Sequence, residues 1–285
     1  MKRIDFQFVH RLRVRWAEVD MQKIVFNAHY LMYFDTAITD YWRALALPYE
    51  EAMLKLGGEL YVKKASIVYH GSARFDDRLD VALKCMRIGN SSMVFSGAIF
   101  RGEALLVTCE LVYVFADPVS QSSRPVPLAL RSLIDRFEAG GCVVATKVGD
   151  WAVLGVDIRQ IRTAVFAQEQ GVAPEDKSDE ADDMALHAVV LNDFGQVIAA
   201  GRLVGISSSI GKISHLAVHR AVRGARIGQG VVETLTYEAR MRGCSEVMVH
   251  AQGSAVGLCQ RQGFIARGEA FMVLGIPHVE MIKNI

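Results

Sequence analysis

The pattern of apolar residues changes about halfway along the chain, and this change is the strongest constraint on its fold. The first part has one helix-like stretch followed by several strand-like stretches, whereas the second part alternates shorter stretches of both kinds. Between them, the segment at 117–127 holds three of the six prolines, and Gly140 and Gly141 follow it. A chain of 285 residues is long enough for two separate cores. We therefore expect two domains, at residues 1–138 and 142–285.

The overall charge and the cysteines argue against several classes of protein. With 32 Lys and Arg against 31 Asp and Glu, the net charge of +1 gives no field that favours nucleic acid or an anionic membrane. The five cysteines are widely spaced and form no C-x-x-C pair, which predicts free thiols, a reducing compartment and no metal site. No stretch approaches the ~18 apolar residues of a membrane span, and no apolar run follows the basic N-terminus. We expect a soluble, cytoplasmic protein.

The first half predicts an α+β domain in which a sheet wraps around one helix. Apolar residues recur every three or four positions between 28 and 45, as on one face of an amphipathic helix. Strand-like alternation occurs on both sides of this helix, at 6–16, 61–69, 79–88, 93–100 and 105–115. A short helix at 128–137 follows the proline-rich segment.

The second half predicts an α/β domain with a mixed central sheet. Strands are expected at 143–147, 187–191, 197–204, 212–218 and 246–251, with two more near the C-terminus. Helices are expected at 158–169, 227–242 and 255–262. An acidic segment lies between the first helix and the second strand; its members are Glu175, Asp176, Asp179, Glu180, Asp182 and Asp183. The simplest interpretation is a solvated face, and the alternative is a collar for a cationic amine.

Asp20 is the candidate catalytic residue of the first half. It stands in a loop just before the predicted helix, where backbone N–H groups in the segment from Asn27 to Tyr30 can point at a carbonyl oxygen. A carboxylate beside a polarised carbonyl is what thioester hydrolysis requires. The same position is also common for a helix cap or a turn residue, so the residues alone leave both interpretations open.

The stretch W-A-E-V-D-M-Q-K-I-V-F-N-A-H-Y-L at 16–31 resembles the signature of hot-dog acyl-CoA thioesterases of the 4-hydroxybenzoyl-CoA thioesterase type. The resemblance covers roughly the first 137 residues and the order of strands. It implies that Asp20 attacks the thioester or activates water, while the helix N-terminus polarises the carbonyl. It also places Asn27, His29 and Tyr30 at the substrate, although Tyr30 is equally suited to the core and His29 to an ordinary helix position.

The resemblance also has one departure and one consequence for assembly. The family commonly has a small residue or Pro and then Gly where this chain has Gln22 and Lys23, so the turn and the access of CoA are expected to differ. Lys23 is also a candidate contact for a CoA phosphate. Hot-dog domains of this type pair their sheets, with sites built across the interface, which implies a homodimer or homotetramer.

The second candidate site is the stretch L-A-V-H-R-A-V-R-G-A-R-I-G-Q-G at 216–230, in which an apolar strand runs into a Gly/Arg loop and then a helix. Several backbone N–H groups that converge at a helix N-terminus can bind a pyrophosphate. This loop resembles the R-x-x-G-x-G/A loop of GNAT-type N-acetyltransferases, and A-V-G-L-C-Q-R-Q-G-F at 255–264 resembles their later helix and turn. The residues implied to bind the cofactor are Leu216, Val218, Arg223, Gly224, Ala225, Arg226, Ile227 and Gly228.

The resemblance to GNAT enzymes implies direct attack of an amine on acetyl-CoA, with a backbone amide near Val218 polarising the acetyl carbonyl. A nearby base must deprotonate the amine, and the candidates are Glu169 and His215. Arg226 stands where the loop usually has its first Gly. Cys259 stands where the family usually has the Tyr that protonates the departing thiolate. From these two departures we expect a modest rate of transfer, or a water in place of the tyrosine as the acid.

The leading hypothesis is a bifunctional enzyme, an acyl-CoA thioesterase fused to an N-acetyltransferase that acts on an unidentified amine. Coenzyme A and acetyl-CoA are expected as substrates, with no tightly bound cofactor. The alternative is a thioesterase whose second half is a catalytically weak CoA-sensing or interaction module. A silent hot-dog scaffold is a third possibility, which the presence of Asp20 disfavours.

Overall fold

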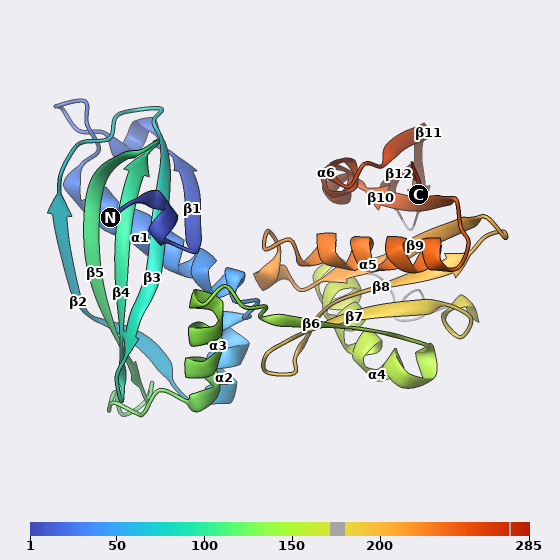
Figure 1. The fold of residues 1–285 in the computed structure, drawn as a ribbon, viewed down its shortest axis with the longest axis horizontal. Helices are drawn as coiled ribbons and strands as arrows, with labels where there is room; N and C mark the ends of the chain where they lie inside the picture. Colours follow the sequence, from blue (N-terminus) through green and yellow to red (C-terminus); the bar gives the residue numbers. More distant parts are fainter. Residues whose placement is uncertain (172–179, 274) are drawn as a thin grey trace. The chain divides into compact units, whose positions relative to one another are not determined.

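The chain forms two compact units (Figure 1). The computed structural model describes residues 1–171, 180–273 and 275–285. The first unit comprises Met1–Val143 and the second Val144–Ile285. The limits expected from the sequence, 138 and 142, lie just before this division, within the segment that contains Gly140 and Gly141.

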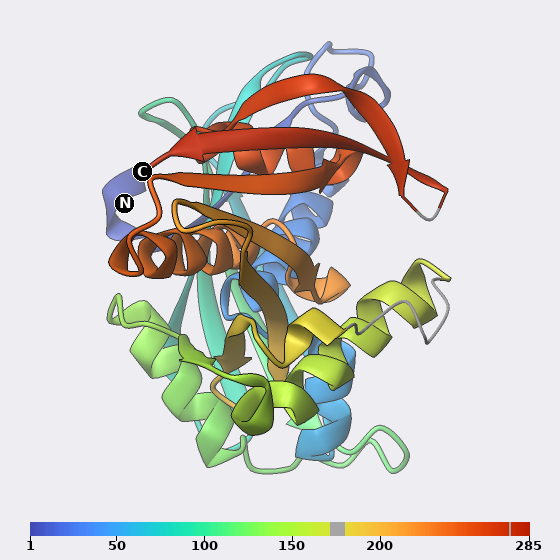
Figure 2. The ribbon, with the colours of Figure 1, turned by 90° about the vertical axis from the view of Figure 1, so that its right-hand side faces the viewer.

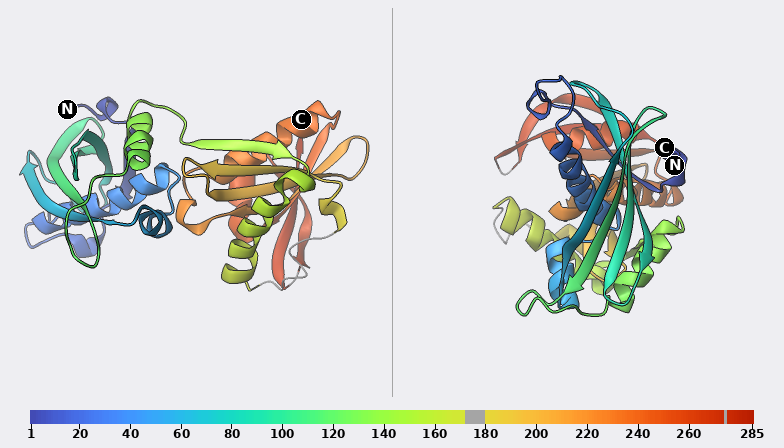
Figure 3. Two further views of the ribbon diagram at one scale, coloured as in Figure 1. Left: turned by 90° about the horizontal axis from the view of Figure 1, so that it is seen from below. Right: turned by 90° about the vertical axis from the view of Figure 1, so that its left-hand side faces the viewer.

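The first unit contains a five-stranded, entirely antiparallel sheet in the order β1-β3-β4-β5-β2. Its strands are β1 (Phe8–Arg13), β2 (Glu59–Tyr69), β3 (Arg78–Ile88), β4 (Ser92–Arg101) and β5 (Ala104–Ala116). The sheet is strongly curved (Figure 3). β3, β4 and β5 are long and pair over most of their length, whereas β1 and β2 are the edges. The predicted run of antiparallel strands is confirmed.

Helix α1 (Asn27–Ala44) packs against this sheet and forms the centre of the core. Its buried residues follow the predicted three- and four-residue spacing: Tyr30, Tyr33, Phe34, Ala37, Ile38, Tyr41 and Trp42. Gly97 in β4 allows the close approach, since a Cβ there would lie 2.5 Å from the Phe34 ring. An antiparallel sheet around one helix is the expected hot-dog arrangement. The sequence did not predict α2 (Tyr49–Leu56), while α3 (Leu128–Glu138) lies where the short helix was expected.

The second unit contains a seven-stranded mixed sheet in the order β11-β12-β10-β9-β8-β7-β6. Its strands are β6 (Val144–Gly149), β7 (Leu186–Asn192), β8 (Val197–Gly205), β9 (Ile210–Val218), β10 (Glu246–Gln252), β11 (Ile265–Val273) and β12 (Ile276–Asn284). Only β9 and β10 are parallel among the strand pairs of the described residues. A helix, α5 (Ile227–Met241), connects them, as a parallel crossover requires. The predicted mixed sheet is confirmed.

Helices cover both faces of this sheet. α4 (Trp151–Arg162) and α5 both contact β7, β8 and β9, and Figures 1 and 2 show them on opposite sides of these strands. α6 (Gly253–Arg261) contacts β10 and β12. The expected helix at 158–169 begins earlier, at Trp151, because Asp150 caps it by accepting a hydrogen bond from Val153 N at 3.0 Å. It continues as a π-helical segment, Thr163–Glu169.

The interpretation of the acidic segment as a solvated face is wrong for Asp182. Its side chain is buried, and its carboxylate accepts hydrogen bonds from Arg162 at 2.7 and 3.0 Å and from Arg202 at 2.8 Å. Buried carboxylates require such partners because the interior provides no water. Glu175, Asp176 and Asp179 lie outside the described residues.

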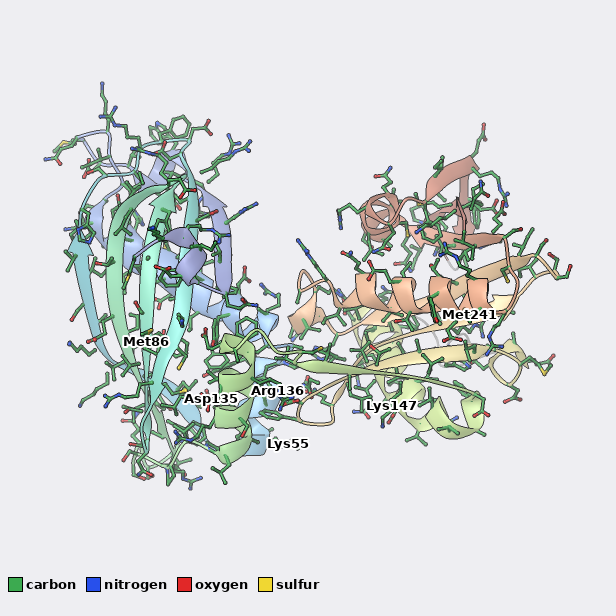
Figure 4. All side chains as sticks on the ribbon, viewed as in Figure 1. Lys55, Met86, Asp135, Arg136, Lys147 and Met241 are labelled. Atoms are coloured by element: carbon green, nitrogen blue, oxygen red, sulfur yellow. The ribbon has the colours of Figure 1, made fainter. Side chains whose placement is uncertain are left out.

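Apolar residues outside the two cores are scattered rather than confined to loops. Figure 4 labels Met86 on β3 and Met241 at the end of α5, which are 60% and 66% exposed. Single exposed apolar residues are ordinary and need no partner. In the parts of the chain that the structure describes, no helix combines the length and hydrophobicity that crossing a membrane requires.

Candidate functional sites

Asp20 opens a tight turn between η2 (Trp16–Glu18) and α1. Its backbone N–H donates to Ile24 O at 2.9 Å, and its carbonyl accepts from Lys23 N at 2.9 Å. Its carboxylate Oδ1 accepts from Gln22 N at 2.8 Å. The turn therefore fixes the backbone of Asp20 while one carboxylate oxygen retains capacity to accept or to attack.

Lys23 explains how this turn forms without the glycine that the resemblance leads one to expect. Its φ is 63°, in the left-handed region that favours glycine. A side chain in this region costs about 1–2 kcal/mol. The chain thus keeps the turn geometry at a cost in folding stability. The side chains of Gln22 and Lys23 are both exposed.

Glu18 is a buried residue of this site that the sequence analysis missed. It is 3% exposed and accepts hydrogen bonds from Arg15 N and from the Tyr33 hydroxyl, both at 2.7 Å. Burial raises the pKa of this carboxyl, but the hydrogen bonds from Arg15 and Tyr33 outweigh burial and lower the pKa overall. Its carbonyl also accepts from Phe26 N at 3.0 Å. Glu18 thereby joins the two ends of the segment that contains the Asp20 turn and links it to Tyr33 of α1.

The N-terminus of α1 presents backbone N–H groups next to this turn. Asn27 and Ala28 are exposed, and His29 N donates to Phe26 O at 2.9 Å. N–H groups in the first turn of a helix have no intrahelical acceptor, and the positive end of the helix dipole favours negative charge there. The half-buried His29 ring contacts the Phe26 ring edge to face.

Tyr30 lies in the core rather than at the surface of the turn. It is 3% exposed, and its hydroxyl accepts a hydrogen bond from Ala73 N at 2.9 Å. Its ring contacts those of Tyr33 and Tyr69. These contacts account for Tyr30 by packing, one of the two interpretations that the sequence left open.

In the second domain, the two parallel strands β9 and β10 separate along their length. They pair from Ile210 and Glu246 to Ile213 and Val249, and no pairing follows beyond these residues in the described chain. The last residues of both strands therefore border a gap in the sheet. The gap opens toward the C-terminal ends of β9 and β10, after which α5 and α6 begin.

A β-bulge in β9 accompanies this separation. Ala200 pairs with Ala217 and Arg202 with Ser214, so His215 and Leu216 lie opposite the single residue Gly201. His215 takes a φ of 50°, in the left-handed region. A Cβ on Gly201 would lie 2.8 Å from Val231 of α5, so glycine is needed where the helix packs on the bulge.

A cavity of about 1070 Å³ occupies the gap. The predicted residues that line it are His215, Leu216, Val218, Arg223, Gly224, Arg226, Ile227 and Gly228, whereas Ala225 and Glu169 are not among its lining residues. His219 N donates to Ile198 O of β8 at 2.8 Å, so the preceding amide of Val218 points away from β8 and toward the gap. The Val218 carbonyl there accepts from Arg223 Nε at 3.0 Å.

The loop between β9 and α5 is tightly constrained. Gly224 has a φ of 90°, and Arg226, the residue before α5, has a φ of 63°. Arg226 therefore takes the left-handed conformation that glycine would take more easily. A Cβ on Gly228 would lie 3.1 Å from Val218 and 3.3 Å from Leu258, so the first turn of α5 packs closely on both.

Glu169 and Cys259 have environments that limit their chemistry. Both carboxylate oxygens of Glu169 accept from Arg223, at 2.5 and 2.7 Å, and these hydrogen bonds lower its pKa, which makes it a weaker base. Cys259 is 3% exposed and lines the cavity. Burial raises the pKa of its thiol to about 11.

The polar residues that line the cavity and that the sequence analysis missed include His250, Gln252 and His278. His250 and Gln252 occupy alternate positions of a strand whose other positions are apolar. That alternation was the available signal, but a polar residue on a half-buried strand usually faces solvent. None of the described residues form a group of three or more His, Cys, Asp or Glu suited to a metal ion.

The geometry of each domain defines its class. The antiparallel sheet around α1 is a hot-dog domain, and the mixed sheet with a bulge, a gap and a Gly/Arg loop is a GNAT-type domain. The family described as Thioesterase superfamily matches residues 22–108, and the family described as Acetyltransferase (GNAT) domain matches residues 157–285. The chain belongs to the GNAT acetyltransferases through its second domain and carries a thioesterase-superfamily domain before it.

Curated relatives match one domain each. The chain is similar to the uncharacterized N-acetyltransferase YjcF of Bacillus subtilis, with 31% identity over 45% of this chain and 91% of the relative. It is also similar to the acyl-CoA thioester hydrolase YbgC of Escherichia coli, with 26% identity over 45% of this chain and 92% of that protein. Each relative is thus covered nearly in full by about half of this chain.

Proposed function

We propose that the chain is a bifunctional enzyme of CoA thioesters. The first domain hydrolyses an acyl-CoA to the free acid and CoA, and the second transfers the acetyl group of acetyl-CoA to an amine. Membership of the thioesterase and GNAT families supports these two reaction classes.

In the first domain, Asp20 is the proposed nucleophile or general base. Its turn directly precedes α1, whose N–H groups at Asn27 and Ala28 can stabilise negative charge on the thioester oxygen. Glu18 supports the arrangement because it links the turn to Tyr33 of the same helix. Substrate contacts of Asn27 and His29 remain part of this proposal.

In the second domain, the single observation that carries the proposal is the gap between β9 and β10. On the side of the gap, the backbone of β9 beyond the bulge is not paired with β10 in the described chain, and the amides of the pantetheine arm of CoA can pair with groups exposed there. The pyrophosphate would lie at the loop before α5, and the Val218 amide would polarise the acetyl carbonyl.

A homodimer or homotetramer is proposed for the hot-dog domain. β2 is an edge strand, and its backbone is able to pair with another strand. Tyr61, Val62 and Val68 on it are 39%, 53% and 54% exposed, which supports burial against a partner. Sedimentation of the intact chain tests this state.

The function is tested on the intact chain with one variant for each site. Asp20→Asn should remove most hydrolysis of a panel of acyl-CoAs, because an amide can neither attack nor accept a proton. Gly228→Asp should weaken CoA binding, since a side chain and a negative charge enter the space beside Val218 and Leu258. Each variant should leave the other activity intact.

The assays are thiol release from the acyl-CoA panel and acetyl transfer to an amine panel, with calorimetric CoA titration of the Asp20→Asn chain. Hydrolysis that survives Asp20→Asn at the wild-type rate removes Asp20 from the mechanism. CoA binding without transfer to any amine would instead support the alternative of a sensing or interaction module.

A further inference from the structure

His250 lies at the point where the sheet of the second domain opens. Val249 is the last residue of β10 that pairs with β9, and His250 follows it directly. His250 also lines the cavity, together with Val218 and His215 from β9. The imidazole therefore faces the same cavity as the Val218 amide, to which the acetyl group is assigned.

The side chain of His250 is on the face of β10 that is turned away from α6. Val249 and Ala251 are buried at 6% and 4%, on the side covered by α6, while His250 and Gln252 take the alternate positions. Gln252 accepts a hydrogen bond from Gln170, just after the π-helical segment, at 3.5 Å. The cavity thus extends from the Gly/Arg loop to the face of the sheet that carries His250 and Gln252. The acceptor amine can approach the thioester from this face.

Glu280 is the charged neighbour of this imidazole. It is the direct cross-strand neighbour of His250 on β12, and His250 Nε2 lies 3.5 Å from Glu280 Oε2. Glu280 is itself held by Arg267 at 2.6 Å, and Arg267 also contacts Glu246 at 3.2 Å. The edge of the Phe271 ring packs 4.9 Å from the imidazole, centroid to centroid. A proton on Nε2 directed at Glu280 leaves Nδ1 as a proton acceptor.

We infer that His250 is the general base of the acetyl transfer and that Glu280 is its positioning residue. The inference rests on the proposed transferase function. The amine nitrogen attacks the thioester carbon, and its proton passes to Nδ1 of His250. The tetrahedral intermediate collapses, the C–S bond breaks, and the proton held by the imidazolium neutralises the departing thiolate, directly or through water. The products are the acetylated amine and CoA, with His250 restored.

The charges around His250 keep it in the form that a base requires. Burial lowers its pKa, and the positive charge of Lys212 on β9 lowers it further, while Glu280 on β12 opposes both. His278, also on β12, adds a smaller lowering effect. Arg267 on β11 contacts Glu280, the neighbour of His250. The neutral imidazole therefore predominates at neutral pH.

His250 differs from the two bases expected from the sequence. Glu169 is paired with Arg223 and does not line the cavity, whereas His250 does. His215 lines the same cavity from the bulge of β9 and is the competing candidate. A comparison of the two histidines therefore decides the assignment.

The experiment uses the intact chain with Asp20→Asn as the parent, so that hydrolysis of acetyl-CoA does not interfere. His250→Gln, His215→Gln, Glu280→Gln and Glu246→Gln are compared for kcat, KM of the best amine in the panel, and calorimetric CoA affinity. His250→Gln should lower kcat by about 100-fold or more with CoA affinity unchanged. Glu280→Gln should lower kcat and shift the ascending limb of the kcat–pH profile to lower pH, because Glu280 raises the pKa of His250.

Glu246→Gln is the matched control, since it also removes an acid that contacts Arg267 but lies away from His250. Its kcat–pH profile should match that of the parent. A near-parental kcat in His250→Gln, a loss of CoA affinity in that variant, or a loss of the ascending limb only in His215→Gln would each overturn the inference. Absence of transfer by the parent itself would instead overturn the proposed function, and the role of His250 with it.

Discussion

Arg162 and Asp182 form a doubly hydrogen-bonded ion pair inside the second domain, with Arg162 1% and Asp182 2% exposed. Arg202 of β8 adds a third hydrogen bond to the same carboxylate and also donates to Ser214 at 3.0 Å. The network connects the end of α4, the segment before β7, and β9 just before its bulge. It thereby ties the covering helix to the strand that borders the cavity.

Asp182→Ala should destabilise the second domain by about 3–5 kcal/mol, because it leaves Arg162 and Arg202 buried without their carboxylate. Urea unfolding of the intact chain, followed by the fluorescence of Trp151 in a chain without the other tryptophans, measures this change. The neighbouring Asp183 is exposed, so Asp183→Ala is the control and should have little effect. Equal stability of Asp182→Ala and the parent would show that the ion pair contributes nothing.

Glu138 makes the stability of the first domain depend on pH. Its Oε1 accepts from the Tyr41 hydroxyl at 2.6 Å and from Cys85 N at 2.7 Å, and burial raises its pKa. The folded state then binds this proton more tightly than the unfolded state. Its contribution is present at low pH and is lost as the pH rises from the ordinary value of Glu through the raised value.

Glu138→Gln should remove this part of the pH dependence and make the domain more stable than the parent at neutral pH, since the amide oxygen can accept the same two hydrogen bonds. Thermal unfolding between about pH 4 and pH 8 measures the effect. Asp135→Asn, an exposed change in the same helix, should keep the parental dependence. A Glu138→Gln variant that still loses stability over this range in parallel with the parent would contradict the prediction.

Arg226→Gly should stabilise the second domain by up to about 1 kcal/mol, because the left-handed backbone costs about 1–2 kcal/mol with a side chain and the greater flexibility of glycine offsets part of the gain. The φ of 63° at this residue is the basis for the expectation. Glu233→Gly, at an exposed position in the interior of α5, should instead destabilise by about 1 kcal/mol. Chemical unfolding compares the two, and a loss of stability in both would show that Arg226 is not strained.

Cys259→Tyr should leave CoA affinity nearly unchanged and raise the rate of acetyl transfer. The residue is buried but lines the cavity, so a larger side chain can extend into that space. A thiol whose pKa is raised to about 11 by burial is a weak acid toward the departing thiolate, and a phenol reaches further. Calorimetry and the acetyl transfer assay check the two parts. A fall in the rate of acetyl transfer at unchanged CoA affinity would mean that Cys259 does not limit this rate.

Much of the fold could be predicted because strong periodicity reports burial directly. The apolar stripe of α1 and the long strands β3, β4 and β5 are buried on one face, so their spacing carries the signal. α2 has only eight residues and two buried ones, Ala52 and Met53, which is too little for a periodic pattern. In the sequence, the C-terminal end of this helix is indicated by Gly57, which adopts a φ of 70° after the last turn.

The parts of the sites that were missed depend on contacts between distant segments. The role of Glu18 depends on its hydrogen bond from Tyr33, and that of Asp182 on its hydrogen bonds from Arg162 and Arg202. His250 and Glu280 are 30 positions apart in the numbering, and only the register of β10 on β12 makes them neighbours. No local pattern encodes such a register, whereas the loop before α5 is a continuous segment and could be recognised from its residues.

The common direction of β9 and β10 decides the electrostatics of the cavity mouth. Because the strands are parallel, the helices that follow them, α5 and α6, must begin at the same edge of the sheet. Ile227 and Gly228 from one helix and Ser254 and Ala255 from the other line the cavity with their first turns. Two positive dipole ends therefore converge on one opening, and an anionic ligand is attracted there before any arginine side chain is counted. An antiparallel pair at this position would have placed the two helix ends at opposite edges and divided that field.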